Sequence, residues 1–312
     1  MKFIDEPYAL YNQVLTIEDQ RDRLDVVLVS PRNPLNIGAV GRAMANFGFA
    51  RLKVVAPFEA HWREARSAVG APELLRSAAE TGTLAEAVAD CTLVLGTGTL
   101  TYRKAEQRVV SLPDVAPLVR GEMERGGRVG LVFGPEKHGL TREDLSYCHL
   151  LVEIPTDERQ PSMNLGQAVA VCLYELAGRG QTLKDPQAEV CGIPPFRQKD
   201  YKKQVLRLAQ EGHPALEAGP DGPGLCPNAD PGDLAGVSGD LELLAGVVEE
   251  VMLAAKYSPA SMREANRHDL RLLLRRLTPS ARDTRRILGL FRRILWRLRR
   301  GQAAYDPKGK ID

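Results

Sequence analysis

Short apolar runs alternate with amphipathic stretches over the first 180 residues. The runs lie at residues 25–30, 51–57, 91–97, 128–133 and 150–155. They are rich in Val and Leu and are followed by turn residues, so each predicts a buried strand. Between them the pattern predicts helices, including one from about Asn36 to Phe47, one opened by a capping box at Thr83 and Glu86, and a short one capped by Thr141. This alternation predicts an α/β domain with a largely parallel sheet.

The pattern changes after residue 180. Residues 212–239 contain seven glycines and five prolines in 28 positions, which predicts a linker or insertion without regular structure. Three helices are expected beyond it, the third opened by Thr278 as N-cap and Pro279 at the first position. We divide the chain into an N-terminal extension (1–24), an α/β domain (25–180), a Gly/Pro-rich linker (181–239) and a small basic helical extension (240–312).

Positive charge is concentrated in the helical extension. The whole chain carries a net charge of +2, yet residues 260–300 hold thirteen arginines against three acids, which favours a polyanionic partner. In the second helix four leucines recur at helical spacing, and three arginines follow another face. The leucines are Leu270, Leu273, Leu274 and Leu277, and the arginines are Arg267, Arg271 and Arg275. We expect the leucines to pack and these arginines, with Arg285 and Arg286, to bind nucleic acid; a solvated basic face is the alternative.

Cysteine usage and hydropathy exclude several classes of protein. The five cysteines are widely spaced and form no CxxC pair, so we expect neither a disulfide framework nor a metal site, and a reducing cytoplasm is the simplest location. The N-terminus lacks a basic region followed by an apolar block, and no run of 18 apolar residues occurs. Export and membrane insertion are therefore not expected.

The turn "PRNPLNIGAVGRAMANFGF" (31–49) raises the question of chemistry, because it places Asn36, Gly38 and Arg42 between a strand and a helix. Such turns hold pyrophosphates in dinucleotide-binding proteins. Here the GxGxxG fingerprint is missing, and the next strand ends without the acid that would bind a ribose. An ordinary turn is the alternative for this segment taken alone.

Three ordered motifs change that interpretation. N-x-G-x-x-x-R at Asn36, Gly38 and Arg42 resembles the first motif of the SpoU (TrmH-like) branch of the SPOUT RNA methyltransferases. "LVFGPEKHGLT" (131–141) resembles the second motif and "IPTDERQPSMNLGQAVAVCLYE" (154–175) the third. The basic helices are further similar to the C-terminal extension of TrmJ-type members of this family, although amphipathic basic helices are common.

The resemblance implies S-adenosylmethionine-dependent methylation of a ribose 2'-hydroxyl, with tRNA position 32 in the anticodon loop as the target. It also implies a SPOUT-type parallel sheet with a C-terminal trefoil knot, and a homodimer whose active site draws on both subunits. The implied catalytic residues are Arg42, Asn36, Glu136, Ser162 and Asn164. Cofactor contacts are implied at Thr97, Gly98, Gly134, Ile154, Met163 and Leu165. Arg103 and Lys104 are candidate RNA contacts because they follow the "GTGT" loop, although TrmJ-type relatives place more arginine there.

The residue types suit this chemistry. A 2'-hydroxyl is a poor nucleophile that must be held in line with the methyl group. Arg42 can grip the adjacent phosphate, whereas a guanidinium resists acting as a base. Asn36 can orient Arg42 or the ribose, Glu136 can pair with Arg42 or order its loop, and Ser162 and Asn164 can cap the next helix or bind substrate. Gly134 suits close approach of the backbone to adenosine.

Three other functions compete with this hypothesis. Ribosomal RNA is the alternative substrate, since it shares all three motifs. A non-catalytic RNA-binding protein with the same fold is the alternative from another class, and a nicotinamide-dependent dehydrogenase is disfavoured by the missing fingerprint. Every nucleotide presents the same 2'-hydroxyl, so the sequence does not choose between cytidine and uridine.

Overall fold

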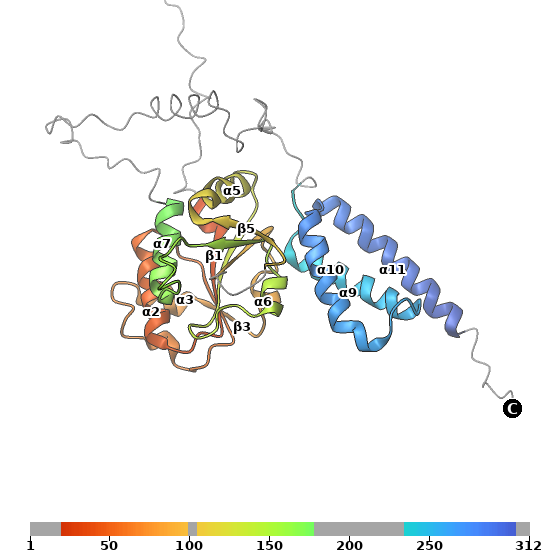
Figure 1. Cartoon of the computed structure of the whole chain (residues 1–312), viewed down its shortest axis with the longest axis horizontal. Coiled ribbons are helices and arrows are strands. Elements are labelled where there is room, and N and C mark those ends of the chain that lie inside the picture. The colour runs from red at the N-terminus through yellow and green to blue at the C-terminus, as the bar shows by residue number, and fades with distance from the viewer. Residues whose placement is uncertain (1–19, 99–104, 178–233, 304–312) are drawn as a thin grey trace, which may run out of the picture. The chain divides into compact units, whose positions relative to one another are not determined.

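Seven strands form one sheet within the residues that the computed structural model describes, namely 20–98, 105–177 and 234–303. The strand order is β3-β2-β1-β6-β4-β7-β5, and every pairing is parallel (Figure 1). The strands are β1 (Leu24–Val29), β2 (Leu52–Val55), β3 (Ala79–Thr81), β4 (Leu93–Thr97), β5 (Arg108–Ser111), β6 (Val129–Phe133) and β7 (Leu150–Glu153). The predicted α/β class with a parallel sheet is confirmed; β3 and β5, which are short and partly polar, were not predicted.

Eight helical segments of the described residues lie around this sheet, and several of them begin at side-chain caps. They are η1 (Arg21–Arg23), α2 (Pro34–Asn46), η2 (Trp62–Glu64), α3 (Pro72–Ser77), α4 (Leu84–Ala87), α5 (Leu112–Glu124), α6 (Arg142–Ser146) and α7 (Leu165–Ala177). The predicted capping box at Thr83 and Glu86 and the cap at Thr141 are both confirmed. Helix α2 starts two residues earlier than predicted, because the Asn33 side chain accepts a hydrogen bond from the Leu35 amide and Pro34 occupies the first position.

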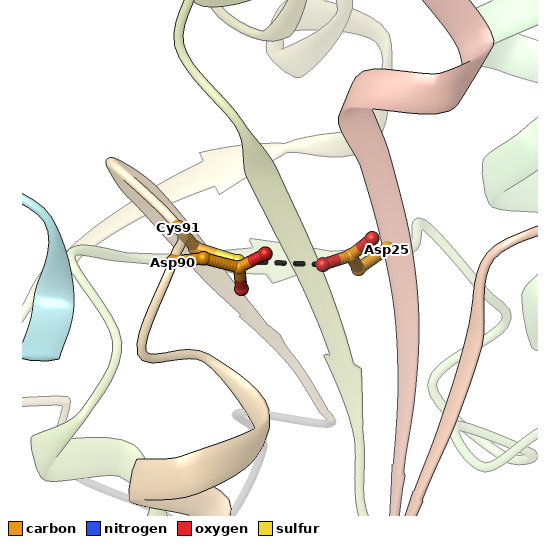
Figure 2. A group of neighbouring side chains, drawn as sticks. All are labelled: Asp25, Asp90 and Cys91. Carbon is orange, nitrogen blue, oxygen red and sulfur yellow. Dashed lines mark hydrogen bonds between the residues drawn. The ribbon is translucent and has the colours of Figure 1, made fainter. Parts of the chain in front are cut away.

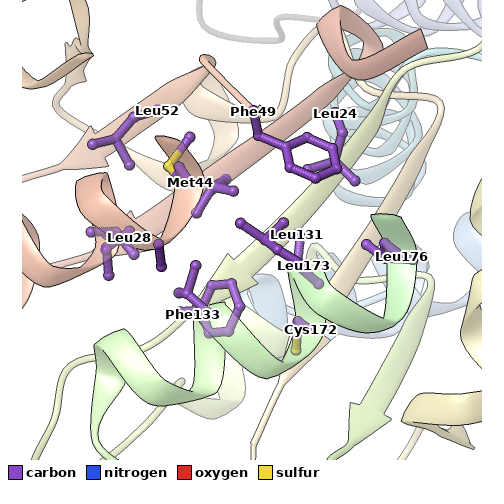
Figure 3. Packing of buried hydrophobic residues seen from close by; sticks show 14 of the residues in the cluster. Leu24, Leu28, Met44, Phe49, Leu52, Leu131, Phe133, Cys172, Leu173 and Leu176 are labelled. Carbon is purple, nitrogen blue, oxygen red and sulfur yellow. The ribbon is translucent and has the colours of Figure 1, made fainter. Parts of the chain in front are cut away.

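Both faces of the sheet are buried, which explains why β1 is apolar at nearly every position. Leu24, Val26 and Leu28 of β1 belong to the cluster packed by α2 and α7, whereas Val27 and Val29 belong to a second cluster that includes residues of α4. Figure 3 shows the first cluster, in which Leu28 and Met44 approach Phe133 and Leu173. A strand that packs on both faces loses the period-two alternation of a half-exposed strand.

Three further helices and a short turn form the helical extension: α9 (Ser238–Ala254), η5 (Ala260–Met262), α10 (Arg263–Leu277) and α11 (Ala281–Ala303). They pack on one another around Leu244, Ala245, Leu274 and Leu288. The predicted N-cap at Thr278 is wrong. Thr278 ends α10 in the left-handed conformation, with φ 41°, and Ser280 takes the capping position by accepting a hydrogen bond from the Asp283 amide at 3.1 Å.

The helical extension is hydrogen-bonded to the α/β body. The Ser238 amide donates to the Cys91 carbonyl at 2.8 Å, and the Gly239 amide donates to the Ala89 carbonyl at 2.9 Å. All described residues belong to one compact unit. The predicted N-terminal extension and linker lie mostly outside the described residues, so the four-part division remains a prediction. Among the helices described, none combines the length and apolar character needed to cross a membrane.

Candidate active site

A cavity of about 1020 Å³ opens among the loops that follow β4, β6 and β7. These strands run parallel, so the loops after them meet at the carboxyl edge of the sheet, where α/β proteins bind ligands. All six positions predicted to contact the cofactor line the cavity: Thr97, Gly98, Gly134, Ile154, Met163 and Leu165. Glu136 and Ser162 line it as well. The second and third sequence motifs thus supply most of one continuous surface.

Hydrogen bonds join all three motifs beside this cavity. Asn164 Nδ2 donates to Asn36 Oδ1 at 3.0 Å, and Asn36 Nδ2 donates to Glu136 Oε1 at 2.8 Å. The same carboxylate accepts bonds from the backbone amides of Arg32 and Asn33 at 3.2 and 3.3 Å. Segments separated by 100 and 128 residues are therefore locked together by two asparagine side chains and one carboxylate.

The environment of Glu136 keeps it ionised. Partial burial acts to raise the pKa of Glu136, but the hydrogen bond from Asn36 and those from backbone amides outweigh it, and the pKa lies below the usual value for glutamate. Of the two roles predicted for Glu136, pairing with Arg42 is wrong, because its partners are Asn36 and the amides of the β1–α2 turn. Ordering the loop is the role that the geometry supports.

Arg42 stands apart from this network. It lies on the exposed side of α2 and is not among the residues that line the cavity. Leu35, one of the exposed large hydrophobic residues, precedes it by two helical turns on the same side of α2. The structure therefore brings together four of the five predicted catalytic residues around the cavity and leaves Arg42 on an open helix face.

Asn164 and Ser162 were each predicted to cap the next helix or to bind substrate, and the structure places them differently. Asn164 Oδ1 accepts a hydrogen bond from the Gly166 amide at 2.9 Å, so Asn164 caps α7 while its amide nitrogen holds Asn36. Ser162 is exposed and lines the cavity. Of the two residues, Ser162 is thus the one that lines the cavity.

Two glycines of the motifs are required by packing. A Cβ on Gly134 would lie 2.2 Å from the Leu140 nitrogen, so this glycine lets the β6–α6 loop fold back on itself. A Cβ on Gly38 would lie 2.1 Å from Ser67 Oγ and 2.8 Å from the Ala68 nitrogen, because residues 65–68 pack against the first turns of α2. We predicted close approach of Gly134 to a ligand; its tightest contacts are with its own loop.

The cavity suits a mostly apolar molecule that carries a positive charge. Phe133, Leu140, Ile154, Met163 and Leu165 supply apolar surface, and the backbone of the three loops supplies polar groups. Three acidic residues, Glu136, Glu153 and Glu158, also line it against one lysine, Lys137, so negative charge predominates. Carboxylates beside an apolar floor favour a flat ring with an attached cation over a polyphosphate, which agrees with the missing dinucleotide fingerprint.

Two of the α10 arginines predicted to bind RNA do not face solvent. Arg271 and Arg275 are only 4% and 2% exposed. Arg271 makes two hydrogen bonds to Glu242, at 2.7 and 2.8 Å, pairs with Glu143 and stacks on Tyr147 with its guanidinium carbon 4.2 Å from the ring centre. The expectation that these two arginines meet RNA phosphates is therefore wrong, because both are buried and Arg271 is already paired with two carboxylates.

Of the other predicted RNA contacts, Arg267 lies 3.0 Å from the buried carboxylate of Glu249. Arg285 and Arg286 are exposed on α11. Arg103 and Lys104 lie outside the described residues. Among the predicted RNA contacts that lie in the described residues, Arg285 and Arg286 are therefore the two that present exposed charge.

The pKa values of the two buried α10 guanidinium groups move in opposite directions. Burial acts to lower the pKa of Arg271, but its hydrogen bonds to Glu242 and Glu143 outweigh this effect and raise it above the ordinary value. Burial lowers the pKa of Arg275 to about 10. Both groups stay charged at neutral pH, and Arg271 fastens α10 to α6, the helix that directly follows the cavity loop at 134–140.

A second cluster of ionisable groups lies at the opposite ends of the strands. Figure 2 shows Asp25 of β1 facing Asp90 and Cys91, and ligand atoms of these three residues lie within 4.8 Å of one another. The carboxylates already have cationic partners, because Lys53 Nζ lies 2.7 Å from both Asp25 and Asp90, and Arg51 and Arg128 pair with Asp25 too. Burial raises the pKa of the Cys91 thiol, which keeps it protonated. Charge pairing explains this cluster without an ion.

Comparisons with known proteins fit this geometry. Residues 23–174 match the model of the SpoU rRNA methylase family. The chain is 39% identical over 156 residues to the tRNA (cytidine-2'-O-)-methyltransferase TrmJ of Methanocaldococcus jannaschii, covering 49% of this chain and 66% of that protein. It is 32% identical over 208 residues to the tRNA (cytidine/uridine-2'-O-)-methyltransferase TrmJ of Sodalis glossinidius, covering 61% and 78%.

A third relative is the tRNA (cytidine/uridine/adenosine-2'-O-)-methyltransferase TrmJ of Pseudomonas aeruginosa, with 38% identity over 169 residues, 52% of this chain and 65% of the relative. The chain thus spans slightly under two thirds of the length of the first two curated relatives that it matches. Among solved structures, TrmJ from Z. mobilis ZM4 superposes with a TM-score of 0.63 at 24% identity, covering 86% of this chain and 98% of that one. That superposition shows a shared fold.

Proposed function

The chain belongs to the SpoU rRNA methylase family, and from this premise we propose that it methylates the 2'-hydroxyl of a tRNA ribose with S-adenosylmethionine as methyl donor. The proposed target is position 32 of the anticodon loop. The observation that carries the proposal is the hydrogen-bonded chain Asn164–Asn36–Glu136 at the edge of a cavity lined by the second and third motifs. The relatives named for tRNA 2'-O-methylation support the substrate.

In this proposal the cofactor lies in the cavity between the loops after β4, β6 and β7. Backbone groups at Thr97, Gly134 and Ile154 border its proposed position, and Leu140 and Leu165 supply the apolar surface for an adenine ring. When bound, S-adenosylmethionine supplies an electrophilic methyl group on a sulfonium centre. The ionised Glu136 places negative charge at the same cavity, which favours a cationic ligand over a neutral one.

The residues of the chain have to position the ribose and its phosphate. Ser162, exposed in the cavity, can donate a hydrogen bond to the RNA. Arg42 grips the phosphate beside the reacting ribose and stabilises developing negative charge. We do not assign proton abstraction to Arg42, because a guanidinium stays protonated in proteins.

We further propose that the enzyme is a homodimer. Arg42 lies on an exposed face of α2 outside the cavity, so a neighbouring subunit is the simplest way to bring it to a reacting ribose. Exposed apolar side chains of Leu35, Val171 and Tyr174 on α2 and α7 support a contact between copies there. Each active site would then combine the cavity of one subunit with Arg42 of the other.

Three finer features of the family complete the proposal. We infer a C-terminal trefoil knot. In support of it, β7 lies between β4 and β5 in the sheet, and the chain then continues to α7, which packs on α2. We propose that residues 25–180 carry catalysis, that 240–312 bind RNA, and that 181–239 link the two. A cytoplasmic location follows from a tRNA substrate.

Ribosomal RNA is the second candidate substrate, favoured by the description of the matched family. The test is transfer of labelled methyl from S-adenosylmethionine to total tRNA and, separately, to ribosomal RNA, followed by nuclease digestion and mapping of the labelled nucleoside. Label on the ribose at position 32 of tRNA supports the proposal and identifies the base. Label only in ribosomal RNA overturns the substrate, and RNA binding without any label overturns the enzymatic activity.

A further inference from the structure

Helix α11 presents a broad basic face with one aromatic residue in it. Eight arginines lie on this helix, at positions 282, 285, 286, 292, 293, 297, 299 and 300. Leu288 and Leu295 of this helix are buried, whereas all eight arginines are exposed. Trp296 lies within that face, since Arg292 and Arg300 are four positions before and after it.

Trp296 is held in place and yet remains accessible. The guanidinium carbon of Arg300 lies 4.2 Å from the centre of the Trp296 ring, which is the geometry of a cation–π contact. Trp296 is nevertheless 49% exposed. It borders a hollow of about 320 Å³ whose other walls are Arg292, Leu295, Arg299 and Arg300. An indole that is fixed on one side and open beside a hollow offers a flat apolar surface at low entropic cost.

The charge around this ring is mostly not neutralised by the protein. Arg299 pairs with Glu250 at 2.6 Å. Within the described residues Arg292, Arg293 and Arg297 have neither an ion pair nor a side-chain hydrogen bond, and Asp283 is the single acid of the whole helix. A surface of this kind attracts a polyanion, and the Trp296 ring gives the apolar parts of that polyanion a place to bind.

We propose that Trp296 stacks on an unpaired base of the bound RNA while the neighbouring arginines neutralise the phosphates on either side of it. The inference rests on the proposed RNA substrate and goes beyond it by naming the kind of nucleotide that the helical extension reads. Every base has a flat face, so stacking tolerates any sequence but requires that the base be unstacked from its neighbours. A continuous duplex hides those faces, which makes a loop or single strand the expected ligand.

Intrinsic fluorescence gives a direct test, because the chain has only two tryptophans and Trp62 is completely buried. Emission from Trp296 is measured while a single-stranded oligoribonucleotide or a fully paired RNA duplex of equal length is added. We expect quenching that saturates with the single strand and little change with the duplex. Binding of the single strand without a change in emission, or equal quenching by the duplex, overturns the proposal.

Variants separate stacking from charge. Trp296→Ala should bind the single strand roughly 5- to 100-fold more weakly, Trp296→Phe should recover much of the loss, and the slope of affinity against salt should stay unchanged in both. Leu290→Ala removes another exposed apolar side chain of α11, on the other side from Trp296, and should bind like the wild type. If Trp296→Ala binds the single strand with wild-type affinity, the proposal is overturned. The same holds if the substitution changes the oligomeric state but leaves RNA affinity unchanged.

These binding measurements are independent of methyl transfer. If the protein transfers no methyl group but Trp296 is quenched by single-stranded RNA, the proposed enzymatic function fails and the stacking inference stands. If methyl transfer occurs and the Trp296 variants bind RNA normally, the inference fails and the function stands.

Discussion

Helices α10 and α11 follow one another, are both rich in arginine, and use that residue in opposite ways. In α10, Arg271 and Arg275 point inward and are nearly inaccessible to solvent. In α11, the arginines face outward, and three of them have no acidic partner within the described residues. The two helices differ in what surrounds them, since α10 meets the carboxylates of Glu143 and Glu242 and the ring of Tyr147.

A basic helix can therefore serve as a structural connection or as a binding surface. A guanidinium is costly to bury unless carboxylates satisfy it, and α6 and α9 provide them for Arg271. Where no acid is available, the charge remains in solvent and can meet phosphates. Substitutions in the two helices should therefore affect different properties, stability in α10 and RNA affinity in α11.

An arginine outside both helices should show the largest effect. Arg42→Ala removes the side chain proposed to hold the phosphate at the reacting ribose, so methyl transfer should fall by about 100-fold or more. Cofactor affinity, measured by equilibrium binding, should not change, because Arg42 does not line the cavity. Arg66→Ala, at another exposed arginine of the α/β body, is the matched control and should keep full activity. Retained turnover in Arg42→Ala contradicts the assigned role.

The inward arginine of α10 should dominate stability. Arg271→Ala removes the partner of Glu242 and Glu143 and the contact with Tyr147, and should lower the free energy of unfolding by about 2–4 kcal/mol. Solvent weakens the pair with Glu143, which is half exposed. Denaturant titration measures the change. Arg293→Ala on α11 should stay within about 0.5 kcal/mol of the wild type. Equal losses in both variants would remove the distinction between the helices.

The outward arginines of α11 should dominate RNA binding. Replacing Arg292, Arg293 and Arg297 together by alanine removes up to three phosphate contacts, which should lower the slope of log affinity against log salt by about 2–3. Filter binding between low and physiological salt measures the slope. The free energy of unfolding should change little, because these side chains have no protein partner to lose. An unchanged slope would mean that α11 serves another partner.

A smaller effect concerns pH. Burial, helped by the charge of Arg275, lowers the pKa of His149 to about 3, whereas an unfolded chain has a value near 6.5. The unfolded state therefore binds a proton that the folded state refuses, and the stability that neutral His149 contributes is lost as pH falls below about 6.5. Between pH 7 and 5.5 this amounts to about 1 kcal/mol.

His149→Asn tests that assignment. An asparagine oxygen can accept the hydrogen bond that the Val94 amide now gives to His149 Nδ1 at 3.0 Å, but it does not titrate. Unfolding curves of the variant and the wild type between pH 5.5 and 7 should therefore differ in their pH dependence. The same pH dependence in both proteins would show that a group other than His149 causes the loss of stability at low pH.

Much of the fold could be predicted from the sequence, because the strands of the sheet centre are apolar on both faces and the caps at Thr83 and Thr141 are local signals. The strands β3 and β5 lack such a signal, since their short polar segments pair only because a neighbouring strand is already present. The cavity lining was also predictable, through motifs that keep their order along the chain.

What the sequence did not reveal depends on contacts between distant residues. Leucine and arginine both recur at helical spacing in α10, and only the position of Tyr147 and two glutamates decides that Arg271 points inward. The link from Asn36 to Glu136 likewise joins residues 100 positions apart. Trp296, by contrast, stands among arginines in the sequence itself and is a local signal for a surface that binds nucleic acid.

The most direct test of this account is steady-state methyl transfer to tRNA by the wild type and by the variant lacking Arg292, Arg293 and Arg297. If the cavity performs the chemistry and α11 holds the RNA, the wild type labels tRNA, and the variant shows a raised KM for tRNA with kcat retained. Absence of transfer by the wild type, or a lowered kcat with unchanged KM in the variant, would contradict the account.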